Sequence, residues 1–354
     1  MTDRWQELLI PKAASVREAM KQLDRTARKI LFVVDADRRL AGSLSDGDVR
    51  RWILADGSLD APVAAACYRK TYAVGEGYDV AEVEREIGRR KILIVPVLDG
   101  RRRVVGLIGG EGFVGAAAAK APAPLSGPVV IMAGGRGERL DPFTRILPKA
   151  LIPIGERTLI EIIFERFRAY RIDHFHVSVG PKAKVIKSYF EELAPPYRIT
   201  FLEEAAPLGT AGALKKLEGT FKGSLVMTNC DVIVDAEYDD IERLHRRSGN
   251  DVTLVAAHRN FVLPYGLCEI EKGGRLKRIV EKPEYGFLVN AGLYFIRDRV
   301  LKLIPAGRPF DVTQLVAAVL AAKGKVGVYP VGQSAWIDTG EWSEYRNAIE
   351  KLKL

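Results

Sequence analysis

The sequence predicts an α/β protein that is built from two parts. From Gly127 onward, strand-like and helix-like segments alternate, which predicts a mixed, mostly parallel sheet with helices on both faces. The part before it contains two copies of one shorter α+β unit, and a glycine-rich stretch follows the first apolar run of the larger part. These three observations place a small α+β module in front of an α/β domain.

Length and composition exclude several classes of protein. The chain has 354 residues, enough for two or three domains, and its 47% hydrophobic and 28% charged residues are typical of a soluble globular protein. The net charge is +9, but the cations are scattered and form no aromatic-basic platform, so we do not expect nucleic-acid binding. Binding of small anionic substrates would explain part of this positive charge as well as nucleic-acid binding would.

The cysteines and the N-terminus indicate the compartment. Cys67, Cys230 and Cys268 lack the spacing of a metal site, which favours a reducing compartment without a disulfide framework. The segment 1–10 has no signal-peptide pattern, and no apolar run approaches the ~18 residues of a membrane span. We therefore expect a cytoplasmic protein that does not bind a membrane.

The first 118 residues contain an internal repeat. Ile30–Asp35 corresponds to Ile94–Asp99, and both read as buried strands that end at a turn. Gly42 and Gly106 then open a second short strand in each copy. Before these strands, each copy has apolar residues at helical spacing: Val16, Ala19 and Leu23, then Val80, Val83 and Ile87. Because one such unit cannot bury its apolar face alone, we expect the two copies to pack together.

This helix–strand–turn–strand–helix repeat resembles the CBS domain, and the pair resembles a Bateman module. In that family a Ser/Thr-x-x-Asp element holds an adenine nucleotide, with the hydroxyl at phosphate and the carboxylate at ribose. Copy one keeps this element as Ser45 and Asp48, whereas copy two has Gly109 and Gly112. The resemblance thus implies at most one site for an adenine or guanine nucleotide. The alternative to nucleotide binding at Ser45 and Asp48 is that these residues only cap a helix. The alternative for the whole module is that it binds no ligand and only joins the copies of a homo-oligomer.

The larger part opens with a short apolar run, Val129–Met132, that predicts a strand buried on both faces. Glycines follow at once, and they let backbone N–H groups approach a bound anion, while nearby cations add full positive charge. The spacing is neither that of a Rossmann dinucleotide site nor that of a P-loop, and a tight turn with solvated arginines is the alternative. The residues concerned are Gly134, Gly135 and Gly137, with Arg136, Arg139 and Lys149.

The whole string from Val129 to Ile154 resembles the signature of the sugar-1-phosphate nucleotidyltransferases, Gly-Gly-x-Gly-Ser/Thr-Arg-Leu-x-Pro-x-Thr followed by Pro-Lys. Glu138 departs from it, since the family usually has a hydroxyl there. The resemblance implies a Rossmann-like, GT-A-like domain over residues 128–354, joined by a linker at 119–127 to the CBS pair at 1–118. It also implies nucleotide contacts from Ala133, Gly134, Gly135 and Gly137.

Further strands and helices are expected along this domain in an alternating order. In open sheets of this kind, ligands bind beyond the carboxyl ends of the strands, where the motifs of this sequence fall. The expected strands are 174–179, 197–202, 224–228 and 325–331, and the expected helices are 160–167, 184–193, 311–322 and 342–352.

A second motif is rich in small residues. Pro207–Leu214 reads Pro-Leu-Gly-Thr-Ala-Gly-Ala-Leu, which matches a segment of the same family at every position. The resemblance implies that this segment lies against the base and sugar of the nucleotide, with contacts from Pro207, Gly209, Thr210 and Gly212. The alternative is a helix that packs closely through small residues.

Two aspartates are the candidate metal ligands. The expected strand Ser224–Thr228 leads to Asp231, and a carboxylate at the end of a central strand is costly without a partner such as a divalent cation. The family usually has Gly-Asp at this point, and its Asp binds magnesium; here Cys230 replaces the glycine. Trp336–Gly340 resembles the second metal element of the family, which implies that Asp338 completes a Mg²⁺ site with Asp231.

Three short motifs resemble the sugar-binding half of the family: Pro264-Tyr265-Gly266, Glu281-Lys282-Pro283 and Asn290-Ala291-Gly292. The resemblance implies that Lys282 binds the phosphate of the sugar phosphate and Glu281 a sugar hydroxyl or amine. It implies further sugar contacts from Tyr265, Gly266 and Asn290. The alternative for Glu281 and Lys282 is an exposed ion pair of little energetic value. The alternative for Asn290 is a buried amide whose hydrogen bonds are purely structural.

The implied reaction is attack by an oxygen of a sugar 1-phosphate on the α-phosphorus of a nucleoside triphosphate, with release of pyrophosphate. The nucleophile is already an anion, so no general base is needed. The obstacle is charge, since two unit charges ~4 Å apart repel by ~4 kcal/mol at an effective dielectric near 20. By resemblance, Arg139 neutralises the leaving pyrophosphate, and Lys149 and Lys282 align the sugar phosphate.

The order of the two parts resembles the guanylyltransferases of bacterial legionaminic acid and related surface-sugar pathways. This likeness implies GTP and glucosamine 1-phosphate, or a related hexose 1-phosphate, as substrates. Mannose-1-phosphate guanylyltransferase and uridylyl- or thymidylyltransferases remain open. The alternative of another class is an inactive nucleotide-sugar sensor.

Overall fold

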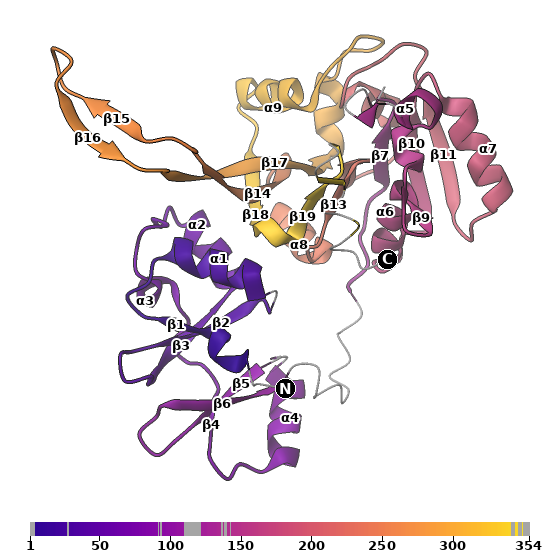
Figure 1. Cartoon of the computed structure of the whole chain (residues 1–354). Coiled ribbons are helices and arrows are strands. Elements are labelled where there is room, and N and C mark those ends of the chain that lie inside the picture. The colour runs from indigo at the N-terminus through magenta and orange to yellow at the C-terminus, as the bar shows by residue number, and fades with distance from the viewer. Residues whose placement is uncertain are drawn as a thin grey trace. The chain divides into compact units, whose positions relative to one another are not determined.

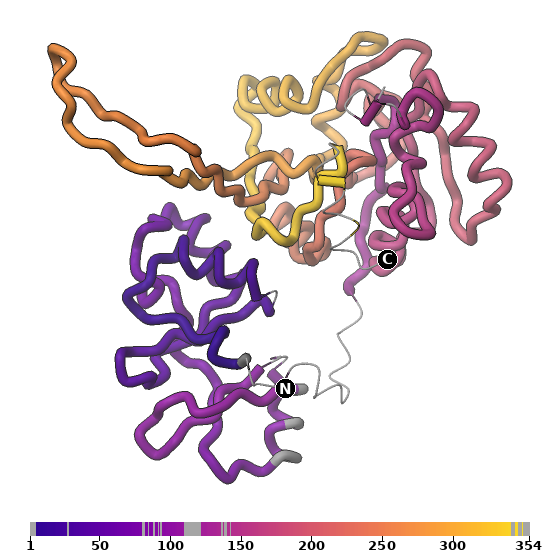
Figure 2. The backbone as a smooth tube through the Cα atoms, viewed as in Figure 1, coloured from indigo at the N-terminus to yellow at the C-terminus, as the bar shows by residue number. Residues whose placement is uncertain are grey.

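The structure is a computed structural model in which the chain divides into two compact units, Met1–Ala121 and Pro122–Leu354 (Figures 1 and 2). No helix of its described part is long and apolar enough to cross a membrane. The residues it describes are 4–26, 28–90, 92, 94–109, 122–135, 137, 140–141, 143–340, 344–345 and 349.

The first unit consists of two halves that share the order strand, helix, strand, strand. Each half has a three-stranded sheet in which the first two strands pair in parallel and the last two pair antiparallel. The first half contains η1 (Arg4–Leu8), β1 (Leu9–Pro11), α1 (Val16–Thr26), β2 (Ile30–Val34), β3 (Leu40–Ser45), α2 (Asp46–Leu54) and α3 (Val63–Ala66). The second contains β4 (Val74–Gly75), α4 (Val80–Arg90), β5 (Ile94–Leu98) and β6 (Val104–Gly109).

The two halves meet through equivalent turns. The Leu40 N–H donates to the Arg102 carbonyl at 3.1 Å, and the Val104 N–H donates to the Arg38 carbonyl at 3.0 Å. Arg38 and Arg102 both have a positive φ, of 62° and 61°. Because each turn makes the same bond to the other, the halves are related by an approximate twofold axis, as the sequence repeat predicts.

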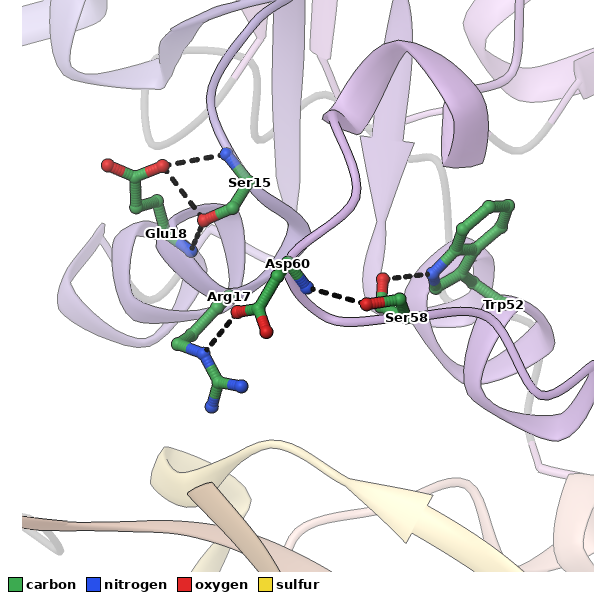
Figure 3. Close-up of polar contacts among 6 residues, drawn as sticks. All are labelled: Ser15, Arg17, Glu18, Trp52, Ser58 and Asp60. Atoms are coloured by element: carbon green, nitrogen blue, oxygen red, sulfur yellow. Dashed lines mark hydrogen bonds and ion pairs between the residues drawn. The ribbon is translucent and has the colours of Figure 1, made fainter. Parts of the chain in front are cut away.

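Figure 3 shows how polar side chains fix the start of α1. The Ser15 N–H and Oγ donate to Glu18 Oε2 at 2.7 and 2.8 Å, and the Glu18 N–H donates to Ser15 Oγ at 3.1 Å. This reciprocal arrangement is a capping box, which satisfies N–H groups that the first turn of a helix leaves unpaired. Nearby, Arg17 pairs with Asp60 at 3.1 Å and the Trp52 indole donates to the Ser58 carbonyl at 2.9 Å.

The second unit is organised around a seven-stranded sheet, in the order β11-β10-β7-β12-β17-β14-β18. Only β17 runs antiparallel to its neighbours, so the sheet is mixed and mostly parallel, as predicted. Its strands are β7 (Val129–Ala133), β10 (His174–Val179), β11 (Arg198–Glu203), β12 (Ser224–Asn229), β14 (Val252–Val262), β17 (Glu284–Arg297) and β18 (Val326–Val331).

The remaining elements of this unit include three two-stranded pairs: β8 (Pro153–Ile154) with β9 (Arg157–Thr158), β13 (Val232–Val234) with β19 (Trp336–Asp338), and β15 (Leu267–Ile270) with β16 (Leu276–Val280). The α-helices are α5 (Phe143–Ile146), α6 (Leu159–Arg168), α7 (Ala183–Leu193), α8 (Tyr238–Arg247) and α9 (Val312–Ala321). The 3-10 helices are η3 (Lys149–Leu151), η4 (Gly212–Leu217), η5 (Asp298–Leu303) and η6 (Gln333–Ala335). The closing helix expected over 342–352 lies mostly outside the described residues.

Apolar cores cover both faces of the sheet. All five residues of β7 are buried; Val129, Ile131 and Ala133 belong to one core, and Val130 and Met132 belong to the other. The first core includes residues of α6, α7 and α8, and the second includes residues of η4, η5 and α9. This alternation along one strand explains why β7 reads as a continuous apolar run.

Two strands of the sheet extend into a long arm, defined here as residues 258–288. β18 pairs with β14 only as far as Ala257, while β14 and β17 stay paired out to Val262 and Glu284. Beyond them β15 and β16 form the tip, and Figure 1 shows the arm projecting away from the sheet. Apolar side chains of the arm are exposed, among them Phe261, Val262, Tyr265, Ile270, Leu276, Ile279, Tyr285 and Phe287.

Candidate active site

The glycine-rich loop follows the carboxyl end of β7 and is closely packed. A Cβ on Gly134 would lie 2.4 Å from Glu204 Oε1, and a Cβ on Gly180 would lie 2.5 Å from the Gly134 carbonyl oxygen. Gly137 has a φ of +72°, and its carbonyl accepts a hydrogen bond from Thr144 Oγ1 at 2.9 Å. Contacts this close exclude larger residues, so the loop backbone itself forms the surface here.

A pocket of about 80 Å³ lies beside this loop. It is at the carboxyl ends of the parallel strands β7 and β10, where ligands of open α/β sheets bind. Lys182 lines the pocket, and its ammonium group donates to the Thr144 carbonyl. The lining includes three of the predicted nucleotide contacts, Ala133, Gly134 and Gly135, together with Pro148 and Gly180.

Arg139, predicted to neutralise pyrophosphate, lies outside the described residues, as do Arg136 and Glu138 of the same loop. Its role therefore stays a prediction. Lys149, the next predicted cation, follows Pro148 as the first residue of η3, and its side chain is only 10% exposed.

The structure brings Lys149 and Asp231 together. The Lys149 ammonium group donates a hydrogen bond to Asp231 Oδ2, and the Asp231 side chain is 13% exposed. The two residues are 82 positions apart in the sequence, so this ion pair is made by the fold. The predicted phosphate-binding lysine and the predicted metal ligand thus share one site, in which the lysine ammonium group is the cation next to the carboxylate.

Asp338 is a cross-strand neighbour of this pair. In the β13–β19 pair Val232 lies opposite Asp338, and the Thr339 N–H and Oγ1 donate to the Asp231 carbonyl at 2.9 and 2.8 Å. Asp338 Oδ1 accepts a hydrogen bond from the Gly340 N–H at 2.7 Å. The fold therefore brings the backbones of the two predicted metal ligands side by side.

These residues fit a magnesium ion, because carboxylate oxygens are the donors that Mg²⁺ takes from proteins. The part of the chain that the structure describes contains no group of three or more His, Cys, Asp or Glu side chains placed to hold a metal. Mg²⁺ usually binds through one or two carboxylates and takes its other ligands from phosphate and water, so two aspartates suffice.

Cys230, which replaces the usual glycine before Asp231, is buried. Burial, together with the neighbouring Asp231 carboxylate, raises the pKa of the Cys230 thiol to about 12. The thiol is therefore protonated near neutral pH and is not a nucleophile. This agrees with the expectation that the reaction needs no cysteine.

The segment Pro207–Gly212 is anchored by Glu204, a residue that the sequence motifs did not identify. Glu204 Oε1 accepts a hydrogen bond from Ser178 Oγ at the end of β10, and Glu204 Oε2 accepts one from the Leu208 N–H at 2.8 Å. Since Gly134 packs against the same carboxylate, Glu204 joins the glycine-rich loop to this second motif. Its signal in the sequence is only an acidic residue just after a strand.

The predicted sugar contacts lie on the arm and in β17. A Cβ on Gly266 would lie 3.0 Å from Glu281 Oε2, so these two predicted residues are neighbours. Tyr265 is 71% exposed, and Lys282 is exposed with a φ of +44°. Within the described residues, no hydrogen bond or ion pair joins these four residues to the Asp231–Lys149 pair.

Asn290 finds its partners inside β17. Its amide nitrogen donates to the Tyr294 hydroxyl, and its Oδ1 accepts a hydrogen bond from the Gly292 N–H at 3.2 Å. A Cβ on Gly292, which has a φ of +77°, would lie 2.9 Å from the Asn229 amide nitrogen. Gly292 of the same motif is thus close to Asn229, the last residue of β12, which lies two residues before Asp231.

Residues 128–353 match a family model described as nucleotidyl transferase. The chain belongs to the nucleotidyl transferase family. A CBS domain model also matches residues 6–55, so a CBS domain precedes the nucleotidyl transferase domain.

Similar curated proteins include two kinds of nucleotidyl transferase. A UTP–glucose-1-phosphate uridylyltransferase from Synechocystis sp. is 27% identical over 62% of this chain and 62% of its own length. A mannose-1-phosphate guanyltransferase from Aspergillus fumigatus is 30% identical over 61% of each chain. The chain thus spans about 60% of the length of these relatives.

The fold has solved counterparts. The structure of HddC from Yersinia pseudotuberculosis covers 64% of this chain and 100% of its own, with a TM-score of 0.51 and 21% identity. At this level of identity the likeness concerns the fold of the nucleotidyl transferase domain alone.

In the CBS domain of this nucleotidyl transferase, Ser45 and Asp48 form a capping box at the start of α2. The Ser45 N–H and Oγ donate to Asp48 Oδ2 at 2.8 and 2.6 Å, and the Asp48 N–H donates to Ser45 Oγ at 3.2 Å. Arg51 also pairs with the Asp48 carboxylate. The helix-cap interpretation is therefore observed, and nucleotide binding by these two residues stays a prediction. In the second copy, Gly109 ends β6, and Gly112 lies outside the described residues.

Proposed function

We propose that this nucleotidyl transferase moves a nucleoside monophosphate from a nucleoside triphosphate to a sugar 1-phosphate and releases pyrophosphate. The observation that carries the proposal is the meeting of Lys149, Asp231 and the backbone of Asp338 at one edge of the sheet. The glycine-rich loop and its pocket lie at the same edge, at the ends of β7 and β10. This arrangement offers backbone N–H groups and a cation to a polyphosphate.

The chain's own residues contribute by binding and by charge. Lys149 can turn from Asp231 to a phosphate group, since its ammonium group binds either anion as a point charge. Lys282 on the arm supplies a second cation for the sugar phosphate. The four histidines lie on other elements: His174 and His176 on β10, His245 on α8 and His258 on β14. A site without histidine suits a reaction whose nucleophile is already ionised.

We further propose that Asp231 and Asp338 hold a Mg²⁺ ion. When bound, such an ion neutralises charge on the reacting phosphates and orients them. Asp231 would then share its carboxylate between the ion and Lys149, and the Lys149 ammonium group would be available for the substrate.

GTP and glucosamine 1-phosphate, or a related hexose 1-phosphate, are the proposed substrates. The order of the CBS and nucleotidyl transferase domains supports GTP, and the guanyltransferase relatives agree with it. HddC has been solved with GMP-PN, a guanine nucleotide by its name. The uridylyltransferase relative makes UTP the alternative, and mannose 1-phosphate is the alternative sugar phosphate.

A substrate matrix tests the proposal. Four nucleoside triphosphates are each combined with a panel of sugar 1-phosphates, and pyrophosphate is measured as phosphate after a coupled pyrophosphatase. We expect release with GTP and a hexose 1-phosphate, and none when either substrate or Mg²⁺ is omitted. If no pair gives pyrophosphate while nucleotide sugars bind, the domain is a sensor and the proposal is wrong.

A further inference from the structure

The segment Pro207–Gly212 is held in place by a loop that comes about a hundred residues later in the chain. The Ala211 N–H donates to the Phe310 carbonyl at 2.9 Å, and the Phe310 N–H donates to the Leu208 carbonyl at 2.8 Å. The two backbones therefore pair in both directions, much as two strands do. Since nothing in the local sequence of either segment requires this pairing, it is a property of the fold.

Side chains extend this connection. Asp311 Oδ1 accepts hydrogen bonds from the Thr210 N–H at 3.0 Å and from Thr210 Oγ1 at 3.2 Å. Thr210 Oγ1 in turn accepts a hydrogen bond from the Val312 N–H at 2.9 Å. The Thr210 hydroxyl thus both donates and accepts, so it is already engaged within the protein. A valine of nearly the same shape could make neither bond.

Asp311 also lies against the turn at Gly209. Gly209 has a φ of +74°, and a Cβ at this position would lie 2.7 Å from Asp311 Oδ1 and 2.9 Å from the Phe310 carbonyl oxygen. The carboxylate therefore fits closely around the glycine. Its loss would leave the left-handed turn without the group that packs against it.

Asp311 is itself firmly placed, because it is the N-cap of α9. The Asp311 N–H donates to Gln314 Oε1 at 2.7 Å, and the two residues form a capping box. Leu315 of the same helix is fully buried in the core. The position of the Asp311 carboxylate is thus fixed by α9, a helix that packs in the core.

We propose that Asp311 is a positioning residue for the nucleoside triphosphate, acting through Thr210 to hold the Pro207–Gly212 segment in its binding shape. This inference rests on the proposed function, and it gives Thr210 a structural task in place of a direct contact with the nucleotide. Because the tether reaches only this segment, its loss weakens nucleotide binding and leaves the sugar phosphate unaffected.

Steady-state kinetics with GTP as the varied substrate test the proposal. We expect Asp311→Ala and Thr210→Val each to raise the KM for GTP about tenfold, the size expected for a lost hydrogen bond to a charged group. The KM for the sugar 1-phosphate and kcat should change less than about threefold. Asp311→Asn keeps a side-chain oxygen that accepts hydrogen bonds, and Thr210→Ser keeps the hydroxyl. Both variants should therefore have a KM for GTP close to that of the wild type.

Asp298→Ala is the matched control. Asp298 also lies at the start of a helix and also holds a glycine, since its carboxylate accepts hydrogen bonds from the Arg299 N–H at 2.7 Å and the Gly223 N–H at 3.2 Å. It has no part in the Pro207–Gly212 segment. If Asp298→Ala raises the KM for GTP as much as Asp311→Ala, or if both KM values rise together, the effect is general destabilisation and the proposal is wrong.

Hydrogen exchange of the full chain without ligand separates this proposal from the proposed function. We expect the Thr210 and Ala211 amides to exchange at least about tenfold faster in Asp311→Ala than in the wild-type chain and in Asp298→Ala. Unchanged exchange overturns the tether, whatever the enzyme assays give. If exchange is faster in Asp311→Ala but the wild-type chain releases no pyrophosphate with any substrate pair, the tether exists as a structural feature only. That result would overturn both the proposed function and the role of Asp311 in positioning the nucleotide.

Discussion

At the scale of single residues, the pair of Lys149 and Asp231 is the central feature of the site. Each side chain is about nine-tenths buried, and each neutralises the other. Removing one member of such a pair leaves a buried charge without compensation, which is strongly destabilising. Both members must therefore stay neutralised. In the proposed reaction this would require Mg²⁺ next to Asp231 and a phosphate group next to Lys149 at the same time.

Asp231→Asn should disable the site. The amide has nearly the same size, but it cannot neutralise Lys149 or bind Mg²⁺ well, so we expect turnover to fall by about a hundredfold or more. Asp235→Asn is the control, because Asp235 pairs with Arg166 and its side chain is 60% exposed. Near-normal pyrophosphate release by Asp231→Asn would contradict the assignment of the metal ligand.

His245 is fully buried and hydrogen-bonded to Ser224 Oγ at 3.0 Å and Thr253 Oγ1 at 2.8 Å. Burial lowers the pKa of His245 to about 4, while an unfolded histidine titrates near pH 6.5. Between these values the unfolded chain binds more protons, so stability is lost as the pH falls from about 6.5 towards 4.

We expect the second unit to lose about 1 kcal/mol from this residue between pH 6.5 and 5.5, which lowers its unfolding temperature by a few degrees. His176, whose pKa burial also lowers to about 4, should add to the effect. His245→Gln removes the titrating group, so its unfolding temperature should depend less on pH. Equal pH dependence in the variant and the wild type would show that His245 does not carry the effect.

At the scale of elements, α1 and α2 begin in the same way. Ser15 with Glu18 and Ser45 with Asp48 each form a reciprocal capping box. An N-cap serine contributes about 1 kcal/mol to stability. Capping alone therefore accounts for the presence of Ser45, and a nucleotide at this position needs a test that separates the two roles.

The comparison of Ser45→Ala with Ser15→Ala provides that test. Both variants should lower the unfolding temperature of the first unit by a similar amount, because both lose one cap. If the CBS domain binds AMP, ATP or GTP through Ser45, the nucleotide should raise the unfolding temperature of the wild-type chain and of Ser15→Ala, but not of Ser45→Ala. Equal shifts in both variants would remove Ser45 from the nucleotide site.

Elements with a strong local pattern could be predicted from the sequence, and contacts between distant segments could not. The strand His174–Val179 has the predicted bounds, and the helix predicted over 311–322 is observed as Val312–Ala321. The length of the arm was not predicted, because an exposed ribbon has no one-sided apolar pattern to mark it. Glu204 and Asp311 could not be predicted as site residues for another reason: the fold, and not the local sequence, brings their hydrogen-bond partners next to them. Asp311 and its partner Thr210, for example, are 101 residues apart in the sequence.

At the scale of the whole molecule, each unit has cores of its own. Within the described part of the chain, each hydrophobic cluster consists of residues from one unit only. The clusters of the first unit lie within residues 5–108, and those of the second lie within residues 125–345. A unit with its own core can unfold cooperatively by itself. The boundary of the two units, at Ala121 and Pro122, lies just before the nucleotidyl transferase domain.

We therefore predict two unfolding transitions in calorimetry of the full chain. Tryptophan fluorescence can assign them, because Trp52 packs against a core of the first unit and Trp336 against a core of the second. Trp52→Phe should diminish the fluorescence change of one transition, and Trp336→Phe that of the other. Added GTP should raise the temperature of the transition reported by Trp336, since a ligand stabilises the unit that binds it. A single transition that both tryptophans report equally would mean that the two units unfold as one.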